Sequence, residues 1–140
     1  MKMKKKIGIC FGTFDLLHPW HLHFLNDARK LVDHLTVIIA RDITVEKVKS
    51  QKPMFSEDQR LQAVKDAQIA DAVVLGSLND KFEIILQTKP DIIILGYDQR
   101  SFVDELYAQI KNFDFSPEIV RLEAYKEHIY KSSLMKEKLK

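Results

Sequence analysis

The chain has 140 residues, of which 46% are hydrophobic and 30% are charged, and its formal net charge at pH 7 is +2. We expect residues 1–140 to form a single domain, since this length and composition suffice for a core of ordinary size. The small net charge gives no reason to expect a nucleic-acid or membrane partner. No apolar run approaches the roughly 18 residues of a membrane span. The single cysteine, Cys10, lies in an apolar run, so we expect a buried, inert thiol in a cytoplasmic protein.

Apolar runs that predict strands alternate with helical patterns along the chain. Two of the runs are continuously apolar, which is typical of strands buried on both faces. We therefore predict an α/β fold with a doubly wound, parallel, five-stranded sheet, whose ligands bind at the carboxyl ends of the strands. Strands are expected at residues 6–11, 35–40, 72–75, 92–95 and 118–122, and helices at 18–32, 56–67, 81–88, 102–112 and 131–139.

The junction between the first strand and the first helix reads GTFDLLHPWH over residues 12–21. Pro19 suits the first position of a helix, where free backbone N–H groups at the positive end of the dipole bind phosphate. His18 and His21 are three residues apart, so both side chains reach the same anion. The alternative is that the pair only caps and packs. A metal site that adds His23 is disfavoured, because His23 points to another side of the helix.

The segment 41–55 follows the second strand without clear periodicity, and we expect a loop that is functional or mobile. Lys47, Lys49 and Lys52 would neutralise an acceptor phosphate there, although an ordinary solvated loop has the same composition. The next helix is expected to begin at Ser56 with a capping box. Arg60, in its first turns, is either a site residue or a surface salt-bridge partner.

Later segments supply further polar groups at the same edge of the sheet. Asp98 comes directly after the fourth strand, where it would meet a ribose or a base, or serve as a plain turn residue. Arg121 ends the fifth strand. Ser132 and Ser133 open the last helix, where hydroxyl groups either bind phosphate or cap the helix.

The junction resembles the signature Gly-x-Phe-Asp-x-x-His-x-Gly-His of the cytidylyltransferase-like nucleotidylyltransferases. The resemblance implies a Rossmann-like nucleotidylyltransferase fold. It also implies an enzyme that transfers a nucleoside monophosphate from a nucleoside triphosphate to a phosphate-bearing acceptor, with release of pyrophosphate. The positions in register are Gly12, Phe14, Asp15, His18 and His21, whereas Trp20 stands where the family has a glycine.

The same resemblance implies roles for individual residues. Mg²⁺ would bridge the triphosphate of the nucleotide, without a metal site on the protein itself. The family also implies a homodimer that binds a nucleotide and a phosphorylated acceptor. The residues implied in catalysis are His18, His21, Lys47 and Lys49, with the register of the two lysines open. The residues implied in nucleotide and phosphate binding are Gly12, Thr13, Phe14, Asp98, Arg121, Ser132 and Ser133.

Within the family, three elements look most like those of the archaeal-type FAD synthetases, which join AMP from ATP to FMN. The alternative is a glycerol-3-phosphate cytidylyltransferase, which uses CTP and typically has Thr-Thr in place of Ser132 and Ser133. The three elements are Gly96-Tyr97-Asp98-Gln99, Arg121-Leu122 and Lys131-Ser132-Ser133-Leu134.

Trp20 leaves the activity open in three ways, because its indole adds on the order of 200 Å² of surface where relatives have none. The ring swings aside or stacks on a base, it narrows the choice of nucleotide, or it blocks the pocket. The third outcome would leave a non-catalytic nucleotide-binding protein. If Trp20 blocks, the variant Trp20→Gly should regain nucleotide binding, and an unchanged affinity would contradict blocking.

Overall fold

The computed structural model describes residues 5–78, 80, 82–96, 99 and 103–122. The helix predicted over 131–139 therefore lies outside the described residues, as do Asp98, Ser132 and Ser133. The described chain forms a five-stranded sheet of order β3-β2-β1-β4-β5, in which every neighbouring pair is parallel. The strands are β1 (Ile7–Gly12), β2 (His34–Ile39), β3 (Ala72–Leu75), β4 (Ile92–Leu95) and β5 (Glu118–Arg121).

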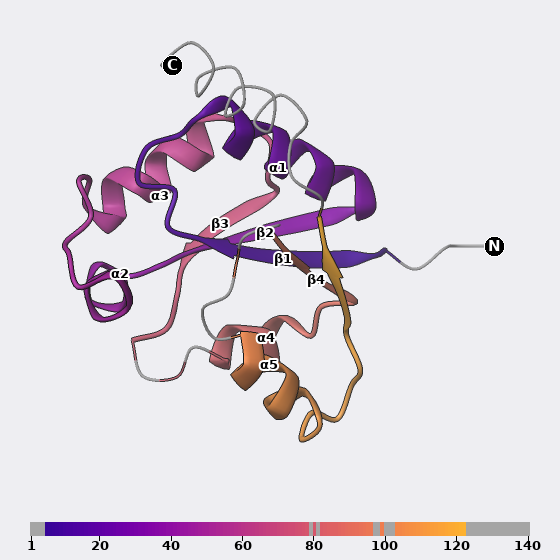
Figure 1. Cartoon of the computed structure of the whole chain (residues 1–140). Helices are drawn as coiled ribbons and strands as arrows, with labels where there is room; N and C mark the ends of the chain where they lie inside the picture. The colour runs from indigo at the N-terminus through magenta and orange to yellow at the C-terminus, as the bar shows by residue number, and fades with distance from the viewer. Residues whose placement is uncertain (1–4, 79, 81, 97–98, 100–102, 123–140) are drawn as a thin grey trace, which may run out of the picture.

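Helices pack on both faces of this sheet, so the predicted doubly wound α/β fold is confirmed. Figure 1 shows α1 and α3 on one face and α4 and α5 on the other. Strand order reverses between β1 and β4, which creates the switch point where such folds bind ligands. No helix in the described part of the chain is long and apolar enough to cross a membrane. The helices are α1 (Pro19–Leu31), α2 (Asp42–Lys49), α3 (Glu57–Asp66), α4 (Glu83–Thr88) and α5 (Val103–Ile110).

Two apolar clusters, one on each face, hold the helices on the sheet. Cys10 and Ile94 belong to the cluster under α1 and α3, while their chain neighbours Ile9 and Ile93 belong to the cluster under α4 and α5. All four residues of β4 are buried, as its continuous apolar run predicted. Burial raises the pKa of the Cys10 thiol to about 12, so the prediction of an inert, buried cysteine is confirmed.

The carboxyl ends of β1, β2 and β3 lie on the left in Figure 1. The Ala40 N–H group donates to the Gly12 carbonyl at 2.9 Å, and the Gly76 N–H group donates to the Ile39 carbonyl at the same distance. These bonds carry the sheet pairing from β1 to β3 beyond the last paired residues of the strands. Residues that follow β1, β2 and β3 are therefore brought to one edge.

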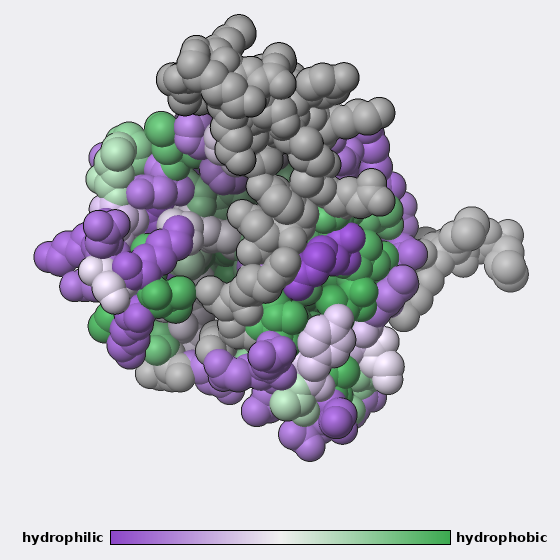
Figure 2. All heavy atoms as spheres, in the orientation of Figure 1, coloured by the Kyte–Doolittle hydropathy of each residue, from purple (hydrophilic) through white to green (hydrophobic). Residues whose placement is uncertain are grey.

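The prediction of a loop over 41–55 is wrong for its first half, because residues Asp42–Lys49 form the helix α2. Its cap comes from a distant residue: Glu57 Oε1 accepts a hydrogen bond from the Asp42 N–H group at 2.8 Å. Val45 is the one buried residue of α2, so the helix shows little apolar periodicity. Lys47 and Lys49 consequently lie on the last turn of a helix. Figure 2 shows a mostly hydrophilic surface over α2.

Candidate functional site

The segment that joins β1 to α1 begins with a close contact between Gly12 and Phe14. A Cβ atom on Gly12 would lie 2.4 Å from the Phe14 ring, so only glycine fits beneath that ring. Phe14 takes a left-handed conformation with φ 50°, and its ring is buried, edge-on to His21 with 5.6 Å between centroids. These two residues therefore shape the turn and support His21. Their predicted contact with a nucleotide stays a prediction.

His18 and His21 lie together at the start of α1, as their spacing predicted, with 5.8 Å between ring centroids. His18 is the N-cap residue, and its backbone N–H group donates to His21 Nδ1 at 3.1 Å. Since that nitrogen accepts, a neutral His21 carries its proton on Nε2. The arrangement makes His21 Nε2 a hydrogen-bond donor, which is the property that a phosphate oxygen requires.

Trp20 stacks on His18. The two rings are nearly parallel at 14°, and their centroids are 4.3 Å apart. A stacked aromatic pair of this kind contributes about 0.5–1.5 kcal/mol beyond the area that it buries. The indole thus covers one face of a candidate catalytic imidazole, an arrangement that the sequence reading of Trp20 did not include.

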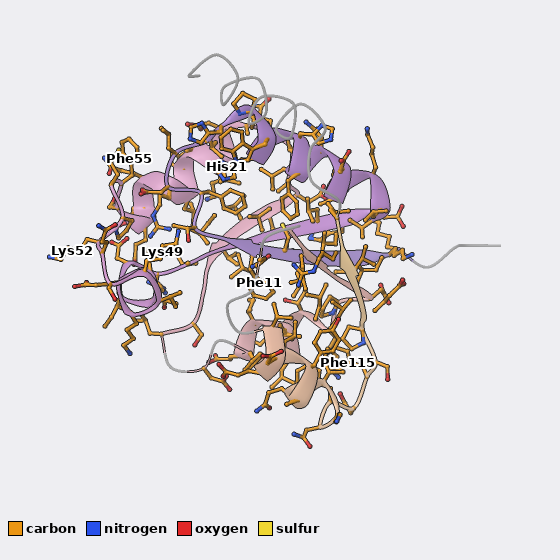
Figure 3. The ribbon with its side chains drawn as sticks, viewed as in Figure 1. Phe11, His21, Lys49, Lys52, Phe55 and Phe115 are labelled. Carbon is orange, nitrogen blue, oxygen red and sulfur yellow. The ribbon has the colours of Figure 1, made fainter. Side chains whose placement is uncertain are left out.

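Asp15 connects residues 12–21, called the signature segment below, to the residues before α3. Its carboxylate accepts hydrogen bonds from the backbone N–H groups of Met54 at 2.7 Å and Phe55 at 2.8 Å. Desolvation raises the pKa of Asp15, but the two N–H donors and the charges of Arg60 and Lys49 outweigh it and lower this pKa below its ordinary value. Lys49 therefore acts electrostatically on the signature segment. Figure 3 shows Lys49, Lys52 and Phe55 together on this side of the molecule.

Arg60 was expected to be either a site residue or a surface salt-bridge partner; it forms a salt bridge with Asp42, but the surface position is wrong, because only 1% of the residue is exposed. Its Nη2 group donates to Asp42 Oδ1 at 2.6 Å, and its Nη1 group donates to the Thr13 carbonyl at 2.8 Å. A third bond joins Nε to the Phe55 carbonyl at 3.0 Å. The guanidinium group thereby ties the signature segment, α2 and the segment before α3 to one another.

Arg41 extends this network to β3. Its Nε group donates to the Gly76 carbonyl at 2.7 Å, and its Nη1 group donates to Glu57 Oε2 at 2.9 Å. Sequence reasoning missed Arg41, Asp42 and Glu57 as supports of the site. The only signal available was that charged residues follow a buried strand and open a helix.

On the other side of β1, the turn after β4 is held by Gln99 and Arg121. Gln99 Oε1 accepts from the Gly96 N–H group at 3.1 Å. Arg121 Nη1 donates to the carbonyls of Gly96 at 2.7 Å and Gln99 at 2.8 Å. Arg121, predicted to bind the nucleotide, therefore also supports the backbone at Gly96 and Gln99.

His23 interacts with a different residue from the other two histidines: its Nε2 atom is 2.8 Å from Asp27 Oδ2. Within the described ranges, no group of three or more histidine, cysteine, aspartate or glutamate side chains gathers to hold a metal ion. Lys52 is exposed in the segment between α2 and α3.

The fold and the site together define a class. A parallel sheet of order 3-2-1-4-5 that carries a histidine pair on a helix start at its switch point is the architecture of an α/β nucleotide-binding protein. Residues 9–138 match the family described as cytidylyltransferase-like. The chain belongs to this family, as the signature predicted.

Individual relatives agree with this assignment. The chain is 41% identical over 142 residues to an FAD synthase of Thermococcus sibiricus, covering 99% of this chain and 96% of that protein. It is also similar to a solved lipopolysaccharide core biosynthesis protein of Thermoplasma volcanium, with a TM-score of 0.80, 35% identity and coverage of 88% and 100%. A pantoate-beta-alanine ligase of Francisella tularensis shares the fold alone, with a TM-score of 0.62 and 16% identity over 87% of this chain and 60% of that one.

Proposed function

We propose that the chain is an FAD synthase, which transfers AMP from ATP to FMN and releases pyrophosphate. The observation that carries this proposal is the 41% identity to an FAD synthase over nearly the full length of both chains. The histidine pair at the start of α1 supports it, because the site offers donors to phosphate. The chain is accordingly a nucleotidyltransferase.

In this reaction a phosphate oxygen of FMN attacks the α-phosphorus of ATP. The new P–O bond forms as the bond between the α-phosphorus and the bridging oxygen to the β-phosphate breaks, and pyrophosphate leaves with that electron pair. Negative charge concentrates at one point, so catalysis consists of positioning and of fixed donors around the phosphates. His18, His21 and the first N–H groups of α1 supply such donors. Lys47 and Lys49 supply positive charge from α2.

The proposed nucleotide side is formed by Thr13, Asp98 and Arg121, with Ser132 and Ser133 on the triphosphate. Support comes from the position of Arg121 at the end of β5, beside the turn that follows β4. Mg²⁺ enters with ATP as part of the substrate, where it neutralises charge on the phosphates.

The test is to incubate the protein with Mg-ATP and FMN, and separately with Mg-CTP and glycerol 3-phosphate. We expect FAD and pyrophosphate in the first mixture, measured by chromatography and a coupled pyrophosphate assay. Pyrophosphate in the second mixture alone would replace the proposal by the cytidylyltransferase alternative. Turnover in neither mixture by a protein that binds ATP would favour a non-catalytic nucleotide-binding protein, whereas ATP binding that appears only in Trp20→Gly would favour a pocket blocked by Trp20.

A catalytic role of the histidine pair is tested by the variant His18→Ala. Loss of one donor to the reacting phosphates should lower kcat by about 10²–10³-fold. The variant His23→Ala is the matched control, because His23 pairs with Asp27 on the same helix. Equal kcat values in the two variants would contradict the role of His18.

We also propose that residues 1–140 form one domain, that the protein is located in the cytoplasm, and that it is a homodimer. A single, fully buried cysteine supports a reducing compartment. The family resemblance supports the dimer. Light scattering measures its mass, and a single cooperative unfolding transition would agree with one domain.

A further inference from the structure

A hollow of about 340 Å³ opens beyond the carboxyl end of β3, and no step of the proposed reaction uses it. Its volume is at the lower end of the range of small-molecule sites. The chain reaches it where β3 ends and α4 begins, in the lower left of Figure 1. Apolar side chains of Leu75, Leu78 and Ile84 line it together with the polar side chains of Ser77, Glu83 and Gln87.

The polar wall of the hollow is organised around Glu83. Its Oε2 atom accepts from Ser77 Oγ at 3.0 Å, and its Oε1 atom accepts from Gln87 Nε2 at 3.1 Å. A carboxylate is an acceptor only, so it suits a ligand that presents an N–H group. Leu78 also lines the hollow and is 64% exposed, so it offers apolar surface to a ligand. The hollow therefore combines an apolar surface with a fixed acceptor.

The hollow belongs to the same edge as the histidine pair. Hydrogen bonds join Ala40 to Gly12 and Gly76 to Ile39, so the ends of β1, β2 and β3 follow one another directly. Neighbouring strands are about 4.8 Å apart, which places the end of β3 about 10 Å from the end of β1. Arg41 spans this interval, since it lines the hollow and donates to the Gly76 carbonyl.

Two ligands must share this edge, because the reaction joins two phosphates at one point beside β1. Arg121, which we assign to the nucleotide side, ends β5 and therefore lies on the β4–β5 side of that point. The ribityl chain and the ring of FMN would then lie over the β2–β3 side of the edge, where the hollow is. In FMN a ribityl chain separates the phosphate from the ring, and its length is comparable to the distance between the two strand ends.

We propose that this hollow binds the isoalloxazine ring of FMN, with Leu78 against the ring face and Glu83 accepting from the ring imide N–H group. The inference rests on the proposed function and adds the subsite that distinguishes a flavin from a smaller phosphorylated acceptor. It assigns Leu78 and Glu83 to substrate specificity rather than to the chemical step.

The test compares two exposed leucines, Leu78 at the hollow and Leu86 on the surface of α4 at 44% exposure. Leu78→Asp replaces the apolar contact with a charged group, whereas Leu86→Asp makes the same change at a residue of α4 that does not line the hollow. We expect Leu78→Asp to raise the KM for FMN by about tenfold or more, with the KM for ATP unchanged. Leu78→Phe should keep the KM for FMN within about twofold, because an aromatic ring restores the contact.

A binding measurement separates this inference from the proposed function. FMN is titrated into each protein without ATP, and quenching of flavin fluorescence gives the Kd. FAD formation by the wild type with equal KM and Kd values in the two aspartate variants would overturn the ring site alone. Weaker FMN binding by Leu78→Asp, in a wild type that makes no FAD, would support the ring site and overturn the function. A wild type that neither binds FMN nor makes FAD would overturn both.

Discussion

The two sides of the carboxyl edge are held by arginines in different environments. On the β1–β2 side, Arg60 is buried and bonds a carboxylate and two carbonyls from three segments. On the β4–β5 side, Arg121 is exposed and bonds two carbonyls of one turn. The first arrangement makes the geometry of the signature segment part of the stability of the fold. The second arrangement holds one turn at the exposed edge of the sheet, so we expect it to contribute less to the folding free energy than the first.

The largest expected effect belongs to Arg60→Ala. Removal of the buried side chain leaves a cavity and takes the hydrogen-bond partner from two carbonyls and from Asp42, which is 42% exposed, so we expect a loss of about 2–4 kcal/mol in the free energy of unfolding. Urea unfolding followed by circular dichroism measures it. Arg29→Ala, which removes a half-exposed partner of Asp71, is the matched control and should cost about 1 kcal/mol or less. Similar losses in both variants would mean that the buried guanidinium group of Arg60 stabilises the fold no more than an exposed ion pair does.

Trp20→Gly tests whether the indole supports or blocks the signature side. Because the ring stacks on His18, we expect a lower kcat, by about tenfold or less, from a loss of about 0.5–1.5 kcal/mol. Trp20→Phe should retain most of the activity. An affinity for ATP that rises by about tenfold in Trp20→Gly would instead establish blocking.

The stacking itself has a spectroscopic test, since Trp20 is the single tryptophan of the chain. His18→Ala should change the fluorescence emission of the indole, whereas His23→Ala should leave it as it is. Identical spectra for all three proteins would mean that the two rings are not in contact in solution.

Arg121→Ala should have a smaller effect on stability than Arg60→Ala, about 1 kcal/mol in urea unfolding, because water replaces the bonds to exposed carbonyls. The KM for ATP should rise more than stability falls, since the turn after β4 loses its support. A loss of stability as large as that of Arg60→Ala would show that both sides are equally coupled to the fold.

The smallest expected effect is the pH dependence that Asp15 contributes. Its folded pKa is lower than its ordinary value, so the stabilisation is present above the unfolded pKa of about 3.9 and is lost as the pH falls through the folded value. The variant Asp15→Asn should therefore show a weaker decline of stability below about pH 4 than the wild type. Parallel declines in the two proteins would mean that Asp15 does not titrate with folding.

Local patterns predicted most of the fold. The continuous apolar runs identified β2 and β4 to within one residue, and Pro19 marked the first residue of α1. The capping box at Ser56 is also present: Ser56 Oγ accepts from the Gln59 N–H group, and Gln59 Oε1 accepts from the Ser56 N–H group. Each of these features depends on residues a few positions apart, which a sequence displays directly.

The helix α2 and the role of Arg60 were not predictable in this way. The cap of α2 comes from Glu57, fifteen positions beyond Asp42, and Arg60 reaches the Thr13 carbonyl across 47 positions. A charged residue with such a partner has the same local pattern as a solvated one, so the pattern left open whether Arg60 lies in the site or on the surface, and the surface alternative was wrong.

The sequence by itself determined the family, the order of strands and helices, and the histidine pair, because short-range periodicity and a contiguous signature encode them. The tertiary structure decided which side chains support the site. It placed Trp20 on His18, buried Arg60 between three segments, and formed the hollow between β3 and α4. These features arise where segments distant in the chain meet at one edge of a parallel sheet, since burial and partner choice are set only when that edge is assembled.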